Sequence, residues 1–340
     1  MSFKEVLPSV NPPLGLEPSS VPQLVSFGFD DNGYPDGIRF VLDTFNSRRN
    51  FDSSPVLVTF FMKGDNAAGK DSHSNAQIQN SWKEAIANGN EIAVHTFSHP
   101  RGEGIDWTAE IEKCIETLEG IGAERKELTG FRTPYLEYSD TAFAAVRRAG
   151  LKYDCSIVEG WQNEQDGTNC LWPYTLGGGS PADPEIPSYP GLWELPLYTL
   201  IVPPDELCPE YGCPAGFRGR MKDAQPFFDE TTGKIAGLDW NIWYGFFMSK
   251  EDALAILKYS FDLHYRGNRS PFLFGVHSDI YSNSYDIRDL EGDEPPRIKA
   301  NASERRETLA EFLDYVLESR AARVTSMKNV LTWMENPVRL

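Results

Sequence analysis

Short apolar segments alternate with helical patterns from about residue 24 to the end of the chain. Several of these segments are β-branched or aromatic and are bounded by turn residues, which is typical of buried parallel strands. A weaker segment lies at Arg323–Ser326. The other predicted strands are Leu24–Phe29, Val56–Met62, Glu91–Val94, Leu128–Phe131, Lys152–Ile157, Trp193–Leu197 and Phe272–Val276.

Three of the intervening segments carry apolar residues at helical spacing. They cover residues 107–119, 250–263 and 304–318. Ser249 and Ser303 stand immediately before the second and third of these segments, and serine is a favoured helix N-cap. We therefore expect three amphipathic helices with one buried face each.

Alternation of strands and helices predicts an α/β fold, an irregular TIM-like (β/α) barrel of seven or eight strands. A doubly wound open sheet is the alternative. Residues 1–23 are interpreted as a proline-rich N-terminal arm, and residues 24–340 as a single catalytic domain. The stretch from Val158 to Met248 breaks the rhythm and is rich in proline, glycine and aromatic residues. We interpret it as one barrel strand within long loops.

The composition limits the partners and the location of the chain. Its net charge of −18 repels phosphate backbones, so nucleic acid is not an expected partner. No apolar run reaches the roughly 20 residues that a membrane span needs. The first residues also lack the pattern of a secretory signal. The protein is therefore either intracellular or a chain from which a signal was removed.

Five cysteines are too few for a disulfide scaffold. A small loop closed by Cys208 and Cys213 is plausible, and Cys155 could pair with Cys170. Cys114 falls on the apolar stripe of a predicted helix, so we expect a buried free thiol there.

Polar groups stand at the ends of four predicted strands. The pair Asp30–Asp31 ends the first, His95 the third, Arg132 the fourth and His277 the segment 272–276. Because the carboxyl ends of barrel strands form the active face, we expect these side chains to converge. His73 and His264 have no such context and are interpreted as structural or exposed.

His95, His99 and one carboxylate would make a divalent metal site with open positions. Zinc fits this ligand set, and cobalt, manganese or another divalent ion would also fit. The second carboxylate could then act as a general base. The simpler interpretations are two solvated loop histidines, a structural ion pair for Arg132 and a core position for His277.

At these positions the chain resembles the polysaccharide deacetylases, the NodB-homology family 4 of carbohydrate esterases. The resemblance rests on ordered motifs from about residue 24 onward, with Asn32 in place of a usual glycine and a closing motif at Gly275–His277. The other motifs are Phe29-Asp30-Asp31, His95-Thr96-Phe97-Ser98-His99 and Arg132-Thr133-Pro134-Tyr135. Segments at 154–157, 171–176, 189–197 and 330–337 are similar to the insect chitin deacetylase branch.

The resemblance implies a metal-dependent hydrolase that removes N-acetyl groups from N-acetylglucosamine units of chitin or chitin oligosaccharides. One divalent metal, zinc or alternatively cobalt or another ion, would be held by Asp31, His95 and His99. Such a hydrolase is expected to be secreted or extracytoplasmic, with chitin-type glycan as its partner.

The resemblance also implies roles for the remaining motif residues. Asp30 would be the general base, and Arg132 would orient it. The backbone N–H of Tyr135 would help to hold the oxyanion, and His277 would protonate the leaving amine. Asp154 is a further catalytic candidate, as partner of the closing histidine, although its spacing differs from that of bacterial members.

Tryptophans of the aromatic-rich stretch are candidates for stacking on sugar rings, and we select Trp172, Trp193 and Trp243. Core packing is the simpler role for each of them.

Other functions remain open. An O-acetyl esterase or a peptidoglycan deacetylase would use the same site, and a non-haem iron oxygenase uses two histidines and a carboxylate. An inactive glycan-binding protein is the non-enzymatic alternative.

Overall fold

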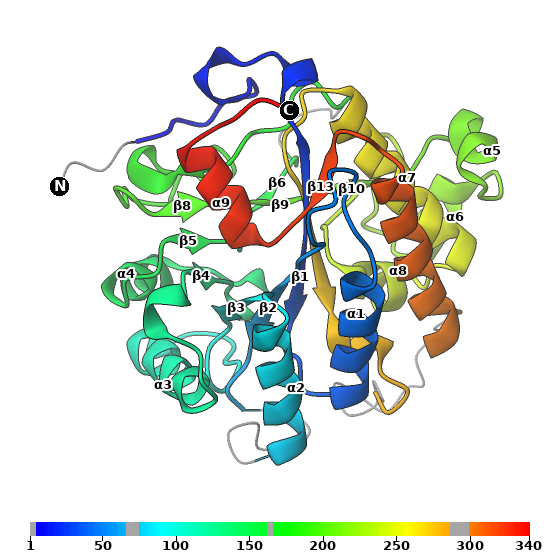
Figure 1. Cartoon of the computed structure of the whole chain (residues 1–340). Helices are drawn as coiled ribbons and strands as arrows, with labels where there is room; N and C mark the ends of the chain where they lie inside the picture. Colours follow the sequence, from blue (N-terminus) through cyan, green and yellow to red (C-terminus); the bar gives the residue numbers. More distant parts are fainter. Residues whose placement is uncertain (1–4, 66–74, 162–165, 286–298) are drawn as a thin grey trace.

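The computed structural model describes residues 5–65, 75–161, 166–285 and 299–340. Helices surround a central sheet (Figure 1). The helices are α1 (Pro35–Asn46), α2 (Ala76–Ala87), α3 (Trp107–Gly120), α4 (Asp140–Arg148), α5 (Cys208–Tyr211), α6 (Phe217–Ala224), α7 (Lys250–Arg266), α8 (Ala302–Leu317) and α9 (Met327–Glu335).

The strands of the main sheet lie in the order β12-β1-β2-β3-β4-β5-β8-β7, and β13 also pairs with β1. All these pairs are parallel except β7–β8. The bounds are β1 (Gln23–Asp30), β2 (Thr59–Met62), β3 (Glu91–Val94), β4 (Gly130–Phe131), β5 (Tyr153–Asp154), β7 (Tyr174–Thr175), β8 (Trp193–Glu194), β12 (Phe272–His277) and β13 (Ala322–Val324).

The expected α/β class is confirmed. The sheet is a curled half-barrel, and in the described residues its hydrogen-bonded path ends at β12 and at β7. The backbone of Gly275 in β12 instead bonds to Gly237, in the long segment before α7. The irregular barrel expected from the sequence is thus a curled half-barrel in the described residues.

The prediction of one strand between Val158 and Met248 is wrong, because this stretch also forms two small sheets. The parallel pair is β6 (Val158–Glu159) with β9 (Leu197–Tyr198), and the antiparallel pair is β10 (Leu200–Ile201) with β11 (Lys234–Ile235). Strands of two residues give too short a pattern to be recognised by hydrophobic periodicity.

The three expected helices are present as α3, α7 and α8. Ser249 is the N-cap of α7, as predicted, and accepts a hydrogen bond from the backbone of Asp252. The N-cap of α8 is Asn301 and not Ser303. Asn301 and Glu304 form a reciprocal capping box, which satisfies two backbone N–H groups at once.

Strand β1 is the centre of the fold, because every one of its residues is buried. The ring of Phe27 lies edge-on against Phe45, Phe274 and Phe312, at centroid distances of 5.0, 6.2 and 6.0 Å. These partners come from α1, β12 and α8. A single aromatic cluster therefore joins the central strand to the helices outside it.

Residues 5–22 lie against the stretch that holds β7. The backbone N–H of Thr175 donates to the carbonyl of Val6, and that of Trp172 donates to Ser9. None of the helices in the described residues is long and apolar enough to cross a lipid bilayer.

All five cysteines are buried free thiols, so the two suggested disulfides are not formed. Cys155 accepts a hydrogen bond from Arg132 (Nη2–Sγ 3.1 Å). The Sγ of Cys213 lies 3.7 Å from the carbonyl oxygen of Cys208. Cys114 is buried on α3, as expected.

Replacing Phe27 by alanine should lower the free energy of unfolding by about 3–5 kcal/mol, because it empties the centre of the aromatic cluster. Phe227→Ala is the matched control. Its side chain is 78% exposed, so a change within about 0.5 kcal/mol is expected. Urea denaturation of both variants measures the difference, and equal losses would contradict the assigned role of Phe27.

Candidate active site

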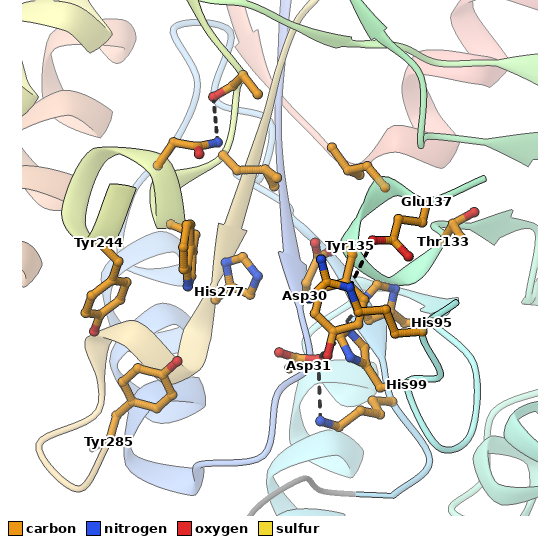
Figure 2. A pocket seen from close by; sticks show the side chains of 17 residues that line it. Asp30, Asp31, His95, His99, Thr133, Tyr135, Glu137, Tyr244, His277 and Tyr285 are labelled. Atoms are coloured by element: carbon orange, nitrogen blue, oxygen red, sulfur yellow. Dashed lines mark hydrogen bonds and ion pairs between the residues drawn. The ribbon is translucent and has the colours of Figure 1, made fainter. Parts of the chain in front are cut away.

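A cavity of about 610 Å³ opens at the carboxyl ends of β1, β3 and β12. This volume is within the usual range for small-molecule sites. Most of the predicted site residues meet here (Figure 2). The cavity is lined by, among others, Asp30, Asp31, Lys63, His95, His99, Tyr135, Trp240, Tyr244, His277 and Tyr285.

Asp31, His95 and His99 form the cluster that could hold a metal. One ligand atom from each lies within 4.8 Å of the other two. The Oδ1 atom of Asp31 is 3.5 Å from Nε2 of His99 and 3.9 Å from Nε2 of His95. This oxygen is buried and has no hydrogen-bond partner, which is costly unless a cation satisfies it.

Both imidazoles of this cluster are suited to ligation. The Nδ1 of His95 lies 2.8 Å from the carbonyl oxygen of Arg132, so it carries the proton and leaves Nε2 as the free donor atom. Burial lowers the pKa of His95 well below its ordinary value and lowers the pKa of His99 to about 4. Two neutral imidazoles and one carboxylate fit a divalent ion such as zinc.

Asp31 stays ionised despite its burial. Burial alone would raise its pKa, but the charge of Lys63, followed by the effects of His99 and His95, holds the pKa of Asp31 well below its usual range.

The backbone of Asp31 is in the left-handed region, with φ at 65°. Thr96 and His99 share that conformation, at 67° and 56°. Such strain commonly accompanies functional sites.

Asp30 is held by a buried ion pair. The Nη1 of Arg132 donates to Oδ1 of Asp30 at 2.6 Å, and both side chains are almost fully enclosed. Burial raises the pKa of Asp30 to about 6, although the positive charge of Arg132 opposes this shift. A carboxylate with such a pKa is a competent general base near neutral pH.

His277 pairs with Asp239 and not with Asp154. The Nδ1 of His277 donates to Oδ1 of Asp239 at 2.7 Å, and the backbone N–H of His277 donates to Oδ2 at 3.1 Å. Burial would lower the pKa of His277, but Asp239 and then Asp30 and Asp31 raise it to about 9. His277 is therefore cationic at neutral pH and can donate a proton into the cavity.

Asp154 lies behind the site and does not line the cavity. Its carboxyl group accepts hydrogen bonds from the backbone and the hydroxyl of Ser156, at 2.7 and 2.9 Å. The Ser156 hydroxyl in turn accepts from the backbone N–H of Thr133. Burial raises the pKa of Asp154 to about 7. These contacts support the loop that carries Tyr135, so Asp154 reaches the site only indirectly.

Tyr135 lines the cavity. Its ring packs edge-on against the imidazole of His99, with the ring centroids 4.6 Å apart. Its backbone φ of 57° is again left-handed. The residue expected to contribute an oxyanion donor is thus next to the metal cluster.

The structure does not bring the three selected tryptophans to the cavity. Trp172, Trp193 and Trp243 are 2%, 7% and 1% exposed, and Trp172 stacks on Trp333. Other aromatic side chains line the cavity, namely Trp240, Tyr244 and Tyr285. Figure 2 shows Tyr244 and Tyr285 on the side opposite His95 and His99, with His277 between.

Asn32 is a buried residue whose importance the motif did not reveal. Its Nδ2 donates to the carbonyls of Phe29 and Phe61, and its Oδ1 accepts from the hydroxyl of Ser278. Its carbonyl accepts from the indole N–H of Trp82. One side chain thus joins β1, β2 and the end of β12, and asparagine tolerates the left-handed φ of 66° found here.

Sequence reasoning also missed Asp239 and Lys63. Asp239 belongs to no strand, and nothing in its spacing indicates a contact with His277. Lys63 directly follows a predicted strand, so the strand-end rule that selected Asp30 and His95 could have found it. His264 is buried and bonds to Ser270, while His73 lies outside the described residues.

Comparison with known proteins identifies relatives of the whole chain. A family model for polysaccharide deacetylases matches residues 20–153. Chitin deacetylase 8 of Bombyx mori is 26% identical, over 97% of this chain and 75% of that protein. Chitin deacetylase 1 of the same species is 23% identical, over 96% of this chain and 53% of that protein.

A solved structure from Mycobacterium smegmatis, whose description assigns it to the polysaccharide deacetylases, has the same fold. The TM-score is 0.59, with 16% identity over 97% of this chain and 95% of that chain.

Replacing Asn32 by glycine should lower the free energy of unfolding by about 2–4 kcal/mol, because it removes three side-chain hydrogen bonds but tolerates the backbone conformation. Ser278→Ala removes only one of the three, and a loss of about 1 kcal/mol is expected. Chemical denaturation compares the two variants. Equal effects would show that Asn32 does not join the strands as described.

Proposed function

Because this chain is a member of the polysaccharide deacetylase family, we propose that it removes N-acetyl groups from N-acetylglucosamine units of chitin or chitin oligosaccharides in a metal-dependent reaction. The observation that carries the proposal is the cluster of Asp31, His95 and His99 in the same cavity as Asp30 and His277. Ligands, base and acid are thereby within reach of one small substrate group.

Asp31, His95 and His99 would hold the ion. Zinc is the proposed metal, and cobalt would suit the same donors. A bound divalent ion supplies Lewis-acid polarisation of a carbonyl and lowers the pKa of a coordinated water.

Asp30 is the proposed general base. Its carboxylate removes a proton from the attacking water, and Arg132 fixes the carboxylate through the 2.6 Å contact. The guanidinium is fully enclosed and also donates to the carbonyls of Gly28 and Cys155, which supports its role in fixing Asp30. The backbone N–H of Tyr135 is the proposed protein donor to the oxyanion.

His277 is the proposed general acid, and it donates its Nε2 proton to the departing amine. Asp239 acts through it, by accepting the Nδ1 proton and stabilising the imidazolium. The two acid–base groups therefore have well-separated pKa values, about 6 for Asp30 and about 9 for His277. Both groups are correctly protonated between these values, as catalysis near neutral pH requires.

A chitin-type glycan is proposed because the two curated relatives are chitin deacetylases. The aromatic side chains of Trp240, Tyr244 and Tyr285 suit the apolar faces of pyranose rings. A secreted or extracytoplasmic location would bring the enzyme to such a substrate. In this proposal, residues 24–340 act as one catalytic domain, with residues 1–23 as an arm.

Acetate release from N-acetylglucosamine oligomers tests the proposal. A chelator should abolish release, and zinc or cobalt should restore it. Asp30→Asn removes the base and the charged partner of Arg132 but none of the proposed metal ligands, so the rate should fall by at least about 100-fold while the folded variant still binds the metal. If the metal-bound protein releases acetate from acetylated xylan and not from chitin oligomers, the site belongs to an O-acetyl esterase. If it binds chitin but releases no acetate, the enzymatic proposal fails.

The pH dependence tests the pairing of His277 with Asp239. His277 acts when protonated, so kcat/KM should fall as pH rises through its pKa of about 9. Asp239→Asn removes the negative charge that raises this pKa, and the alkaline limb should move by at least about one pH unit to lower pH. Asp154→Asn is the control, because Asp154 does not bond to His277. If the alkaline limb of the pH profile stays in place in Asp239→Asn, the pairing of Asp239 with His277 is refuted.

A further inference from the structure

Lys63 is a buried cation inside the candidate metal cluster. It lies directly after β2, lines the cavity and is 4% exposed. Its Nζ is 3.6 Å from Oδ1 of Asp31. That oxygen is the one that also faces His95 and His99, at 3.9 and 3.5 Å. The ammonium group is therefore as near to the central ligand oxygen as the two imidazole nitrogens are.

The backbone fixes this position. The N–H of Lys63 donates to the carbonyl of Asp31 at 3.3 Å, and the next residue, Gly64, donates to the carbonyl of Thr96. Lys63 is thus fastened between the loops that carry Asp31 and His99. The backbone of Lys63 lies beside the cluster. Its side chain therefore reaches Asp31 without having to extend inward from the protein surface.

The charge of Lys63 interacts with the carboxylate of Asp31 and, at longer range, with that of Asp279. In the described residues, Asp31 is the only carboxylate within ion-pair distance of its Nζ. Without a metal, Lys63 and Asp31 neutralise each other in a poorly hydrated place. With a divalent ion on Asp31, His95 and His99, the same ammonium would face a like charge, and repulsion is strong where water is largely excluded.

We propose that Lys63 is a built-in counter-cation of the metal cluster. It stabilises the metal-free protein by neutralising Asp31, and it weakens the affinity of the cluster for a divalent ion. The inference rests on the metal site of the proposed function. It deepens that function by making metal loading a competition between the ion and a side chain of the protein itself.

The test uses the full chain stripped of metal and compares it with Lys63→Gln. The dissociation constant for zinc, measured by competition with a chromogenic chelator, should be at least about tenfold lower in the variant. The melting temperature of the metal-free variant should fall, because Asp31 loses its partner. The rise in melting temperature on adding zinc should be larger than in the wild type. A merely structural lysine would lower both melting temperatures without tightening zinc binding.

Three further variants control the measurement. Lys234→Gln removes the same charge from a similarly buried residue of β11 that does not line the cavity, and it should leave the zinc constant unchanged. Lys63→Arg keeps the charge and should bind zinc as weakly as the wild type. Lys63→Met keeps the length of the side chain without its charge. It serves as the second neutral variant if Lys63→Gln does not fold.

The outcomes separate the two proposals. If the wild type binds zinc and a folded neutral variant binds it equally or more weakly, Lys63 is not a counter-cation and the metal site stands. If the wild type takes up neither zinc nor cobalt, the metal-dependent function itself is overturned, and the inference about Lys63 fails with it.

Discussion

The buried ion pair between Arg132 and Asp30 is the interaction on which the rest of the site depends. Arg132 has no exposed surface, and its guanidinium also donates to the backbone carbonyls of Gly28 and Cys155. One side chain therefore joins β1, β4 and the residue after β5. Removing either member of such a pair leaves an uncompensated charge in the interior, which commonly costs about 3–5 kcal/mol. The geometry of the candidate site and the inner packing of the half-barrel therefore depend on the same ion pair.

This ion pair also constrains the neighbouring residues. A Cβ on Gly28 would lie 3.0 Å from Nη2 of Arg132 and closer still to Met327 and Phe61. The guanidinium fills the space that a side chain at position 28 would occupy, and it lies over the ring of Phe61 at 4.2 Å. Glycine at position 28 therefore leaves room beside β1 for the side chains of Met327, Phe61 and Arg132. The cost of burying that pair is offset by hydrogen bonds from all three nitrogen atoms of the guanidinium.

The electrostatics of the cavity divide it into two halves. On the side of β3, burial keeps His95 and His99 neutral. On the side of β12, Asp239 keeps His277 cationic. Both halves use histidine in an enclosed place. The largest difference is the carboxylate of Asp239, 2.7 Å from Nδ1 of His277, and Asp30 and Asp31 raise the pKa of His277 further. The same residue type can therefore serve as a ligand in one half and as an acid in the other.

The sequence by itself determined the alternation of strands and helices. Because parallel strands present their carboxyl ends on one face, it also predicted that Asp30, His95 and Arg132 would lie close together. Those residues lie next to strands, where the pairing register leaves little freedom in the position of a side chain. Only the tertiary structure decided that Asp239 partners His277, and that Trp240 lines the cavity while Trp172 is packed away. Both outcomes arise in the long stretch before α7, where strands of two residues leave no periodic pattern. Contacts there are set by packing between segments far apart in the chain, which local sequence does not encode.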